Sequence, residues 1–89
     1  MTEFDVTVVN RLGLHARAAA KFVHLASTFV SRVTVSREGT RVDGKSILGL
    51  LTLAASKGTK LRLSIQGDDE DDAGAQLTEL VRSRFGEDG

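Results

Sequence analysis

The stretch NRLGLHARAAA (Asn10–Ala20) marks the point where the sequence changes from a strand pattern to a helix pattern. Before it, Phe4, Val6 and Val8 alternate with polar residues, as is typical of a strand with one buried face. After it, apolar residues recur at helical spacing from Ala16 onward. A strand that leads through a glycine directly into a helix therefore decides how the chain begins to fold.

The helix expected from Ala16 has an apolar stripe and a polar face. The stripe contains Ala16, Ala19, Ala20, Val23 and Ala26, widened by Phe22, Leu25 and Phe29. The residues expected to face solvent are Arg17, Lys21, His24 and Ser27. Because alanine side chains are small, this helix should be able to lie close to a sheet.

The same two periodicities alternate along the rest of the chain. Strands are expected over 32–36, 40–42 and 60–66, a helix over 47–53, and a last helix from the acidic run 68–72 to Phe85. The apolar face of the last helix contains Ala73, Leu77, Leu80, Val81 and Phe85, and its final turn contains Arg82 and Arg84. The tail Glu87-Asp88-Gly89 is expected to fray.

These elements follow the order β-α-β-β-α-β-α. Strands that alternate polar and apolar residues indicate an antiparallel sheet with one face toward water. The helices should cover the other face, which makes a two-layer α+β sandwich. A chain of 89 residues has room for one core, so residues 1–89 are expected to form a single domain.

The composition restricts the classes of function. There are 12 Lys and Arg against 12 Asp and Glu, so no net field favours nucleic acid or an anionic membrane. Cysteine is absent, which leaves no disulfide or thiolate, and the acidic run does not match an EF-hand loop. We therefore expect no metal and no cofactor. The apolar runs are too short to span a bilayer, and the first residues lack a signal-peptide pattern, which favours the cytoplasm.

His15 is the candidate nucleophile. At a helix start the backbone N–H groups have no intrahelical partner, and the helix dipole adds positive potential. Such a place suits phosphate, and Arg17 adds a fixed positive charge. The dipole also favours the neutral ring with a nucleophilic nitrogen. From these residues alone, an ordinary surface histidine is the simpler interpretation, and a phosphohistidine is the alternative.

Ser46 opens the short helix expected over 47–53. Its hydroxyl can cap that helix, and a phosphoserine there would also be favourable, so a structural and a regulatory role both stay open. The helix is apolar nearly all round, so part of it fills the core and part should stay exposed as a docking patch. The candidates for the patch are Ile47, Leu48 and Leu51.

A lone helical histidine is usually incidental, so His24 is assigned a rim contact at most.

Two motifs resemble those of a known family. Gly13-Leu14-His15-Ala16-Arg17, followed by Ala-Ala and Phe22-Val23, is similar to the active-site signature of HPr, the histidine-containing phosphocarrier of the bacterial sugar phosphotransferase system. Gly44-Lys45-Ser46-Ile47-Leu48-Gly49, followed by Leu51-Thr52-Leu53-Ala54, is similar to the second HPr signature. The motifs lie at the family's usual separation, and the resemblance runs from the first strand to the last helix.

The resemblance implies an open-faced β-sandwich: four antiparallel strands in the order 1-4-2-3, with three helices on one face. His15 would accept a phosphoryl group at Nδ1 from phosphorylated enzyme I, with phosphoenolpyruvate as the distant donor, and pass it to EIIA-type proteins. Arg17 would stabilise the phosphohistidine. Ser46 would be the target of HPr kinase/phosphorylase. The protein would be a carrier, not a stand-alone enzyme.

The expected partner-binding residues are Ala20, His24, Ile47, Leu48 and Leu51, on a protein expected to be a monomer. Two positions depart from the family pattern. Ala18 replaces the usual proline, which adds a backbone donor and loosens the start of the helix. His24 replaces a lysine found in many members, which should weaken docking to an acidic surface.

Three other functions compete with sugar transport. A carrier of a nitrogen-type regulatory branch would share the same residues, and the sequence does not separate the two. A non-catalytic module that signals through Ser46 would lack the histidine, so His15 counts against it. A small RNA-binding domain is disfavoured by the zero net charge and by aromatics limited to four phenylalanines.

Overall fold

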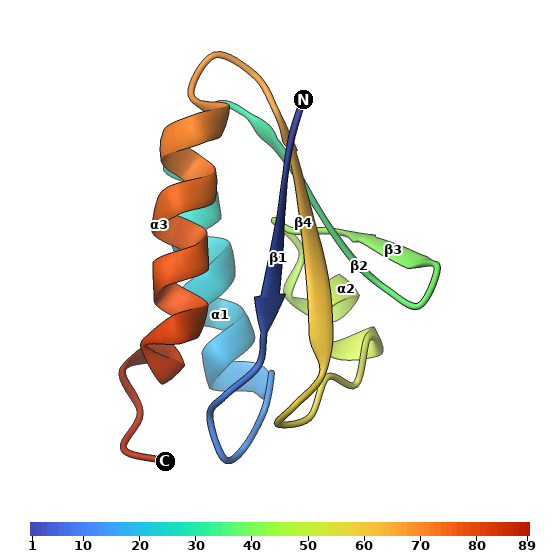
Figure 1. The fold of residues 1–89 in the computed structure, drawn as a ribbon, viewed down its shortest axis with the longest axis vertical. Helices are drawn as coiled ribbons and strands as arrows, with labels where there is room; N and C mark the ends of the chain where they lie inside the picture. The colour runs from blue at the N-terminus through green and yellow to red at the C-terminus, as the bar shows by residue number, and fades with distance from the viewer.

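A single four-stranded antiparallel sheet, in the order β1-β4-β2-β3, forms one layer of the computed structural model, which describes residues 1–89. Its strands are β1 (Thr2–Thr7), β2 (Arg32–Arg37), β3 (Thr40–Asp43) and β4 (Lys60–Gln66). The helices are α1 (Ala16–Ala26), α2 (Ile47–Thr52) and α3 (Glu70–Arg82), followed by a short 3-10 turn, η1 (Arg84–Gly86). The three helices lie on one side of the sheet (Figure 1). The predicted element order, strand order and fold class are confirmed.

The strand register places apolar residues of neighbouring strands opposite one another. Val6 pairs with Leu61 and Val35 pairs with Leu63, and all four side chains are buried. On the open face, Arg62 donates from Nε to Asp5 Oδ1 at 2.9 Å. Alternation along each strand therefore separates a covered face from a wet one.

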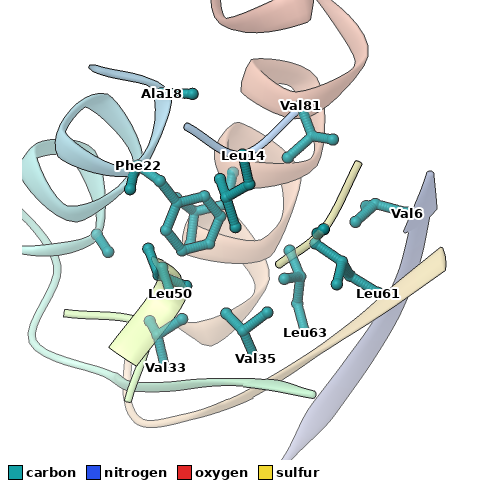
Figure 2. Close-up of a cluster of buried hydrophobic side chains, with 14 of the residues drawn as sticks. Val6, Leu14, Ala18, Phe22, Val33, Val35, Leu50, Leu61, Leu63 and Val81 are labelled. Atoms are coloured by element: carbon teal, nitrogen blue, oxygen red, sulfur yellow. The ribbon is translucent and has the colours of Figure 1, made fainter. Parts of the chain in front are cut away.

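The core lies between the sheet and the helices, and Figure 2 shows Phe22, Leu14 and Leu50 gathered in one cluster with the sheet residues Val35 and Leu63. In α1 the buried residues are Ala18, Ala19, Phe22 and Ala26. The predicted stripe is wrong at Ala16 and Ala20, which are exposed, and it omits Ala18, which is buried, because the covered face of α1 runs through Ala18 and Ala19. None of the helices has the length and apolar character needed to cross a bilayer.

The end of the chain departs from the single long helix that was predicted. The helix α3 ends at Arg82, and Phe85 lies in η1 with a φ of 54°. Phe85 is buried, as expected of the apolar face, but the prediction that it lies in the last helix is wrong. Arg84 likewise lies beyond the last turn of α3, with a φ of 61°. These left-handed residues turn the chain, and the C-terminus lies at the same end of the molecule as the start of α1 (Figure 1).

Candidate functional site

The loop between β1 and α1 is held by backbone contacts. Gly13 has a φ of +68°, and a Cβ built there would lie 2.6 Å from Ala55 O, so this place requires glycine. The amide of Leu14 donates to Ala55 O at 2.8 Å. The buried side chain of Asn10 donates from Nδ2 to Gly13 O at 2.7 Å. The residue that follows the loop, His15, is therefore placed by a fixed support.

His15 is the N-cap residue of α1, as the sequence predicted. Its backbone is extended, with φ −78° and ψ 179°, and its carbonyl accepts the Ala19 amide at 2.8 Å. The side chain makes no capping bond, so the ring is not used to satisfy the helix. The first helical N–H groups, of Ala16, Arg17 and Ala18, have no intrahelical acceptor. An anion beside the ring would meet free donors and the positive end of the dipole.

One ring nitrogen of His15 has a partner that the sequence did not suggest. Nε2 contacts the Glu87 carboxylate at Oε2, and the two side chains are 26% and 16% exposed. Glu87 Oε1 accepts a hydrogen bond from Asn10 Nδ2 at 2.9 Å. The amide of Asn10 and the ring of His15 together lower the pKa of Glu87, so this group is a carboxylate at neutral pH. The Nδ1 atom is left as the nitrogen without a hydrogen-bond partner.

The C-terminal segment that carries Glu87 is docked on the protein. Lys21 donates from Nζ to Phe85 O at 2.7 Å, and the Arg11 amide donates to Gly89 O at 2.8 Å. The expectation that the tail frays is therefore wrong. A short polar tail gives no periodic signal, and its contacts are made with residues more than 60 positions earlier. The only hint in the sequence is the apolar Phe85 just before it, which is buried and fixes where the tail starts.

Positive side chains gather beside this segment. A shallow hollow of about 340 Å³ is lined by Arg11, Arg17 and Lys21 together with the tail residues 86–89, which include Glu87 and Asp88. Arg17 is exposed and forms no ion pair within the chain. Its guanidinium follows the ring of His15 by two residues, in the first turn of α1. Arg17 therefore leaves an unpaired positive charge in the turn that follows His15, of the kind that binds phosphate.

Ser46 is the N-cap of α2, and its Oγ accepts the Gly49 amide at 3.0 Å. Within α2, Leu50 is buried, Leu51 is half-buried, and Ile47 and Leu48 are 40% and 77% exposed. Ser46 therefore caps α2 as one of its two predicted roles requires, and the residue as a whole is half-buried.

The other residues expected to meet partners lie on the neighbouring helix. Ala20 and His24 are both exposed on α1, which packs against α2. The sequence-predicted patch is therefore distributed over two adjoining helices. Part of it, Ile47 and Leu48, is apolar surface that the fold leaves uncovered.

Comparison with known proteins gives one consistent family. The family model described as the PTS HPr component phosphorylation site matches residues 2–83. The phosphocarrier protein HPr of Xylella fastidiosa is 51% identical over 88 residues, which cover 99% of each chain. A crystal structure of HPr from Thermoanaerobacter tengcongensis superposes with a TM-score of 0.96 at 43% identity, over all of both chains. A dimer of HPr from the same organism has a TM-score of 0.78 at 44% identity, over 98% of this chain and 100% of that one.

Proposed function

The chain belongs to the HPr family of phosphocarrier proteins of the phosphotransferase system, and on that premise we propose that His15 Nδ1 is the atom that carries the phosphoryl group. The observation that carries this proposal is the placement of a partly exposed imidazole at the uncapped start of α1. The free amides of that turn and the nearby Arg17 supply donors and positive charge for three phosphoryl oxygens.

The transfer needs positioning and charge stabilisation, and little covalent machinery. The lone pair of Nδ1 attacks the phosphorus of a phosphorylated donor protein. The new N–P bond forms as the bond from phosphorus to the donor breaks, and the donor atom keeps that electron pair. The proton on Nε2 stays in place. Transfer onward is the same step in reverse, with an acceptor nucleophile in the place of the donor.

The partners proposed are enzyme I as the donor and EIIA-type proteins as acceptors. Their docking surface would be a patch of α1 and α2 formed by the exposed Ala20, His24, Ile47 and Leu48 and by the half-buried Leu51. Ile47 and Leu48 supply exposed apolar surface, and Ala20 and His24 lie on α1, the helix that begins directly after His15. The monomeric state stays a prediction, because one related HPr forms a dimer in its crystal.

Ser46 is proposed as a regulatory site for an HPr kinase/phosphorylase. A phosphate on its Oγ would sit at the start of α2, where negative charge is tolerated, directly before the apolar Ile47 and Leu48. It would therefore oppose docking without unfolding the helix. With the kinase and ATP, the protein should form an acid-stable phosphate that Ser46→Ala cannot form. Labelling of Ser46→Ala would contradict this assignment.

The test of the main proposal is incubation with enzyme I and phosphoenolpyruvate, followed by mass spectrometry. We expect one added phosphoryl group, labile in acid and stable in base, in the protein and in His24→Ala. The His15→Ala variant should not acquire it. Labelling that survives His15→Ala would refute the assignment.

A further inference from the structure

Glu87 reaches the ring of His15 from the opposite end of the chain. Its Oε2 contacts Nε2, while its Oε1 accepts a hydrogen bond from Asn10 Nδ2. Asn10 is fully buried and uses the same amide to hold Gly13 O. The carboxylate is therefore fixed on both sides, by a rigid donor and by the imidazole itself.

We propose that Glu87 is a positioning residue that keeps the proton of His15 on Nε2 and so presents the lone pair of Nδ1 to the phosphoryl donor; this inference rests on the proposed function. An ionised carboxylate can only accept hydrogen bonds. A neutral imidazole donates from one nitrogen and offers a lone pair on the other. Contact between Nε2 and a carboxylate therefore selects the ring form that carries hydrogen on Nε2.

The same contact acts after the transfer. When Nδ1 bonds to phosphorus and Nε2 keeps its proton, the ring becomes formally cationic. The carboxylate of Glu87 then faces a positive ring, which it stabilises more than the neutral one. This reduces the free-energy difference between the loaded and the unloaded carrier, as a reversible carrier requires.

The segment that carries Glu87 is held independently of the ring. Phe85 is buried, its carbonyl accepts from Lys21 Nζ, and Gly89 O accepts the Arg11 amide. Replacement of the Glu87 side chain should therefore leave the segment docked. Asp68, which precedes α3, is exposed, makes no hydrogen bond or ion pair through its side chain and does not line the hollow beside Arg17, so it provides a charge control.

Two variants separate positioning from a merely structural role. Glu87→Ala removes the acceptor, so the ring should become a mixture of its two neutral forms. In Glu87→Gln, the single oxygen is claimed by Asn10 Nδ2, which its second hydrogen bond, to Gly13 O, holds in place as a donor. The amide nitrogen then faces His15 and donates to Nε2, so the ring proton must move to Nδ1. The conservative variant should thus be worse than the truncated one.

The measurement combines ¹⁵N–¹H multiple-bond NMR of the ring, in alkaline buffer, with the rate of phosphorylation by enzyme I and phosphoenolpyruvate. We expect hydrogen on Nε2 in the unsubstituted protein and in Asp68→Asn, and on Nδ1 in Glu87→Gln. The rate should fall about tenfold in Glu87→Ala and further, up to about a hundredfold, in Glu87→Gln. The rate of Asp68→Asn should stay within about twofold of that of the unsubstituted protein.

Hydrogen on Nδ1 in the unsubstituted protein would overturn the inference, and so would equal rates in all four proteins. A Glu87→Gln protein that reacts as fast as the unsubstituted one, or faster than Glu87→Ala, would also overturn it. These outcomes leave the proposed function intact, since His15 is still labelled. Failure of the unsubstituted protein to accept any phosphoryl group would instead refute the function itself.

Discussion

Asn10 donates a hydrogen bond of 2.9 Å to the Glu87 carboxylate, across 77 positions of sequence. The same amide nitrogen donates to Gly13 O at 2.7 Å, so one buried side chain joins the loop before α1 to the C-terminal segment. His15 lies between these two parts and contacts the second. The site is therefore assembled from both ends of the chain.

Loss of the Asn10 side chain should destabilise the protein. In Asn10→Ala, the buried Gly13 carbonyl and the Glu87 carboxylate both lose a donor, which should cost about 1–3 kcal/mol in the free energy of unfolding. Urea denaturation measures this value. Gln76→Ala removes an exposed hydrogen bond of 3.1 Å from the Gln76 side-chain amide to Asp72. It should lower the free energy of unfolding by under about 0.5 kcal/mol. Equal losses in the two variants would show that the Asn10 contacts contribute little.

A methyl group at Gly13 should be poorly tolerated for two reasons. The backbone has a φ of +68°, and a Cβ would lie 2.6 Å from Ala55 O and 2.9 Å from Ser56 Cα. Gly39 has a similar φ, +86°, but a Cβ there meets nothing within 4 Å. Both alanine variants incur the backbone strain, but only Gly13→Ala adds the collision. Its free energy of unfolding should therefore be about 1–3 kcal/mol lower than that of Gly39→Ala. Thermal unfolding of the pair checks this, and similar midpoints would argue against a rigid loop.

Acid should weaken the contact of the tail with the site. Hydrogen bonds from Asn10 and His15 lower the pKa of Glu87 below its ordinary value of 4.5. A lowered carboxyl pKa contributes stability that is present above 4.5 and is lost as the pH falls through the folded-state value. The pKa values of Asp69 and Glu70 are also lowered, chiefly by hydrogen bonds from the hydroxyls of Ser31 and Thr2, so their contributions to stability are lost in acid in the same way.

The Glu87→Gln variant isolates this contribution. Between about pH 7 and about pH 3, its free energy of unfolding should fall less than that of the unsubstituted protein, because the other lowered carboxyls remain. Urea titrations at several pH values give both curves. Parallel curves would mean that Glu87 is not ionised and paired in the folded state.

A charge placed on the exposed surface of α2 should impair docking and leave folding intact. Leu48 is 77% exposed, so Leu48→Asp should change the free energy of unfolding by under about 0.5 kcal/mol. The KM of enzyme I for the Leu48→Asp protein should rise about tenfold or more, because the charged aspartate disfavours burial of this surface against enzyme I. Val30 has nearly the same exposure, 78%, and follows the other end of α1. A Val30→Asp protein with the same rise in KM would contradict the assigned surface.

The sequence predicted most of the fold because its signals are local. Alternation along β1 and β4, and the alanine-rich spacing of α1, each report burial of one face. The Ser46 cap was also predictable, since a hydroxyl before an apolar run can accept the free amides. His15 was placed at the start of α1 because the strand pattern and the helix pattern meet there.

The sequence did not predict how the chain ends. The left-handed φ values of Arg84 and Phe85 interrupt a pattern that reads as one continuous helix. The contact of Glu87 with His15 then depends on where that turn directs the tail, which no local periodicity encodes. Contacts between distant segments are decided by packing in three dimensions, so this half of the site required the structure.

The most direct test of the central claim is the ³¹P–¹⁵N coupling pattern of the protein after loading by enzyme I and phosphoenolpyruvate. We predict a single phosphorus signal coupled to Nδ1 of residue 15. Phosphorus bonded to Nε2 of His15, to the ring of His24 or to a serine oxygen would contradict the account.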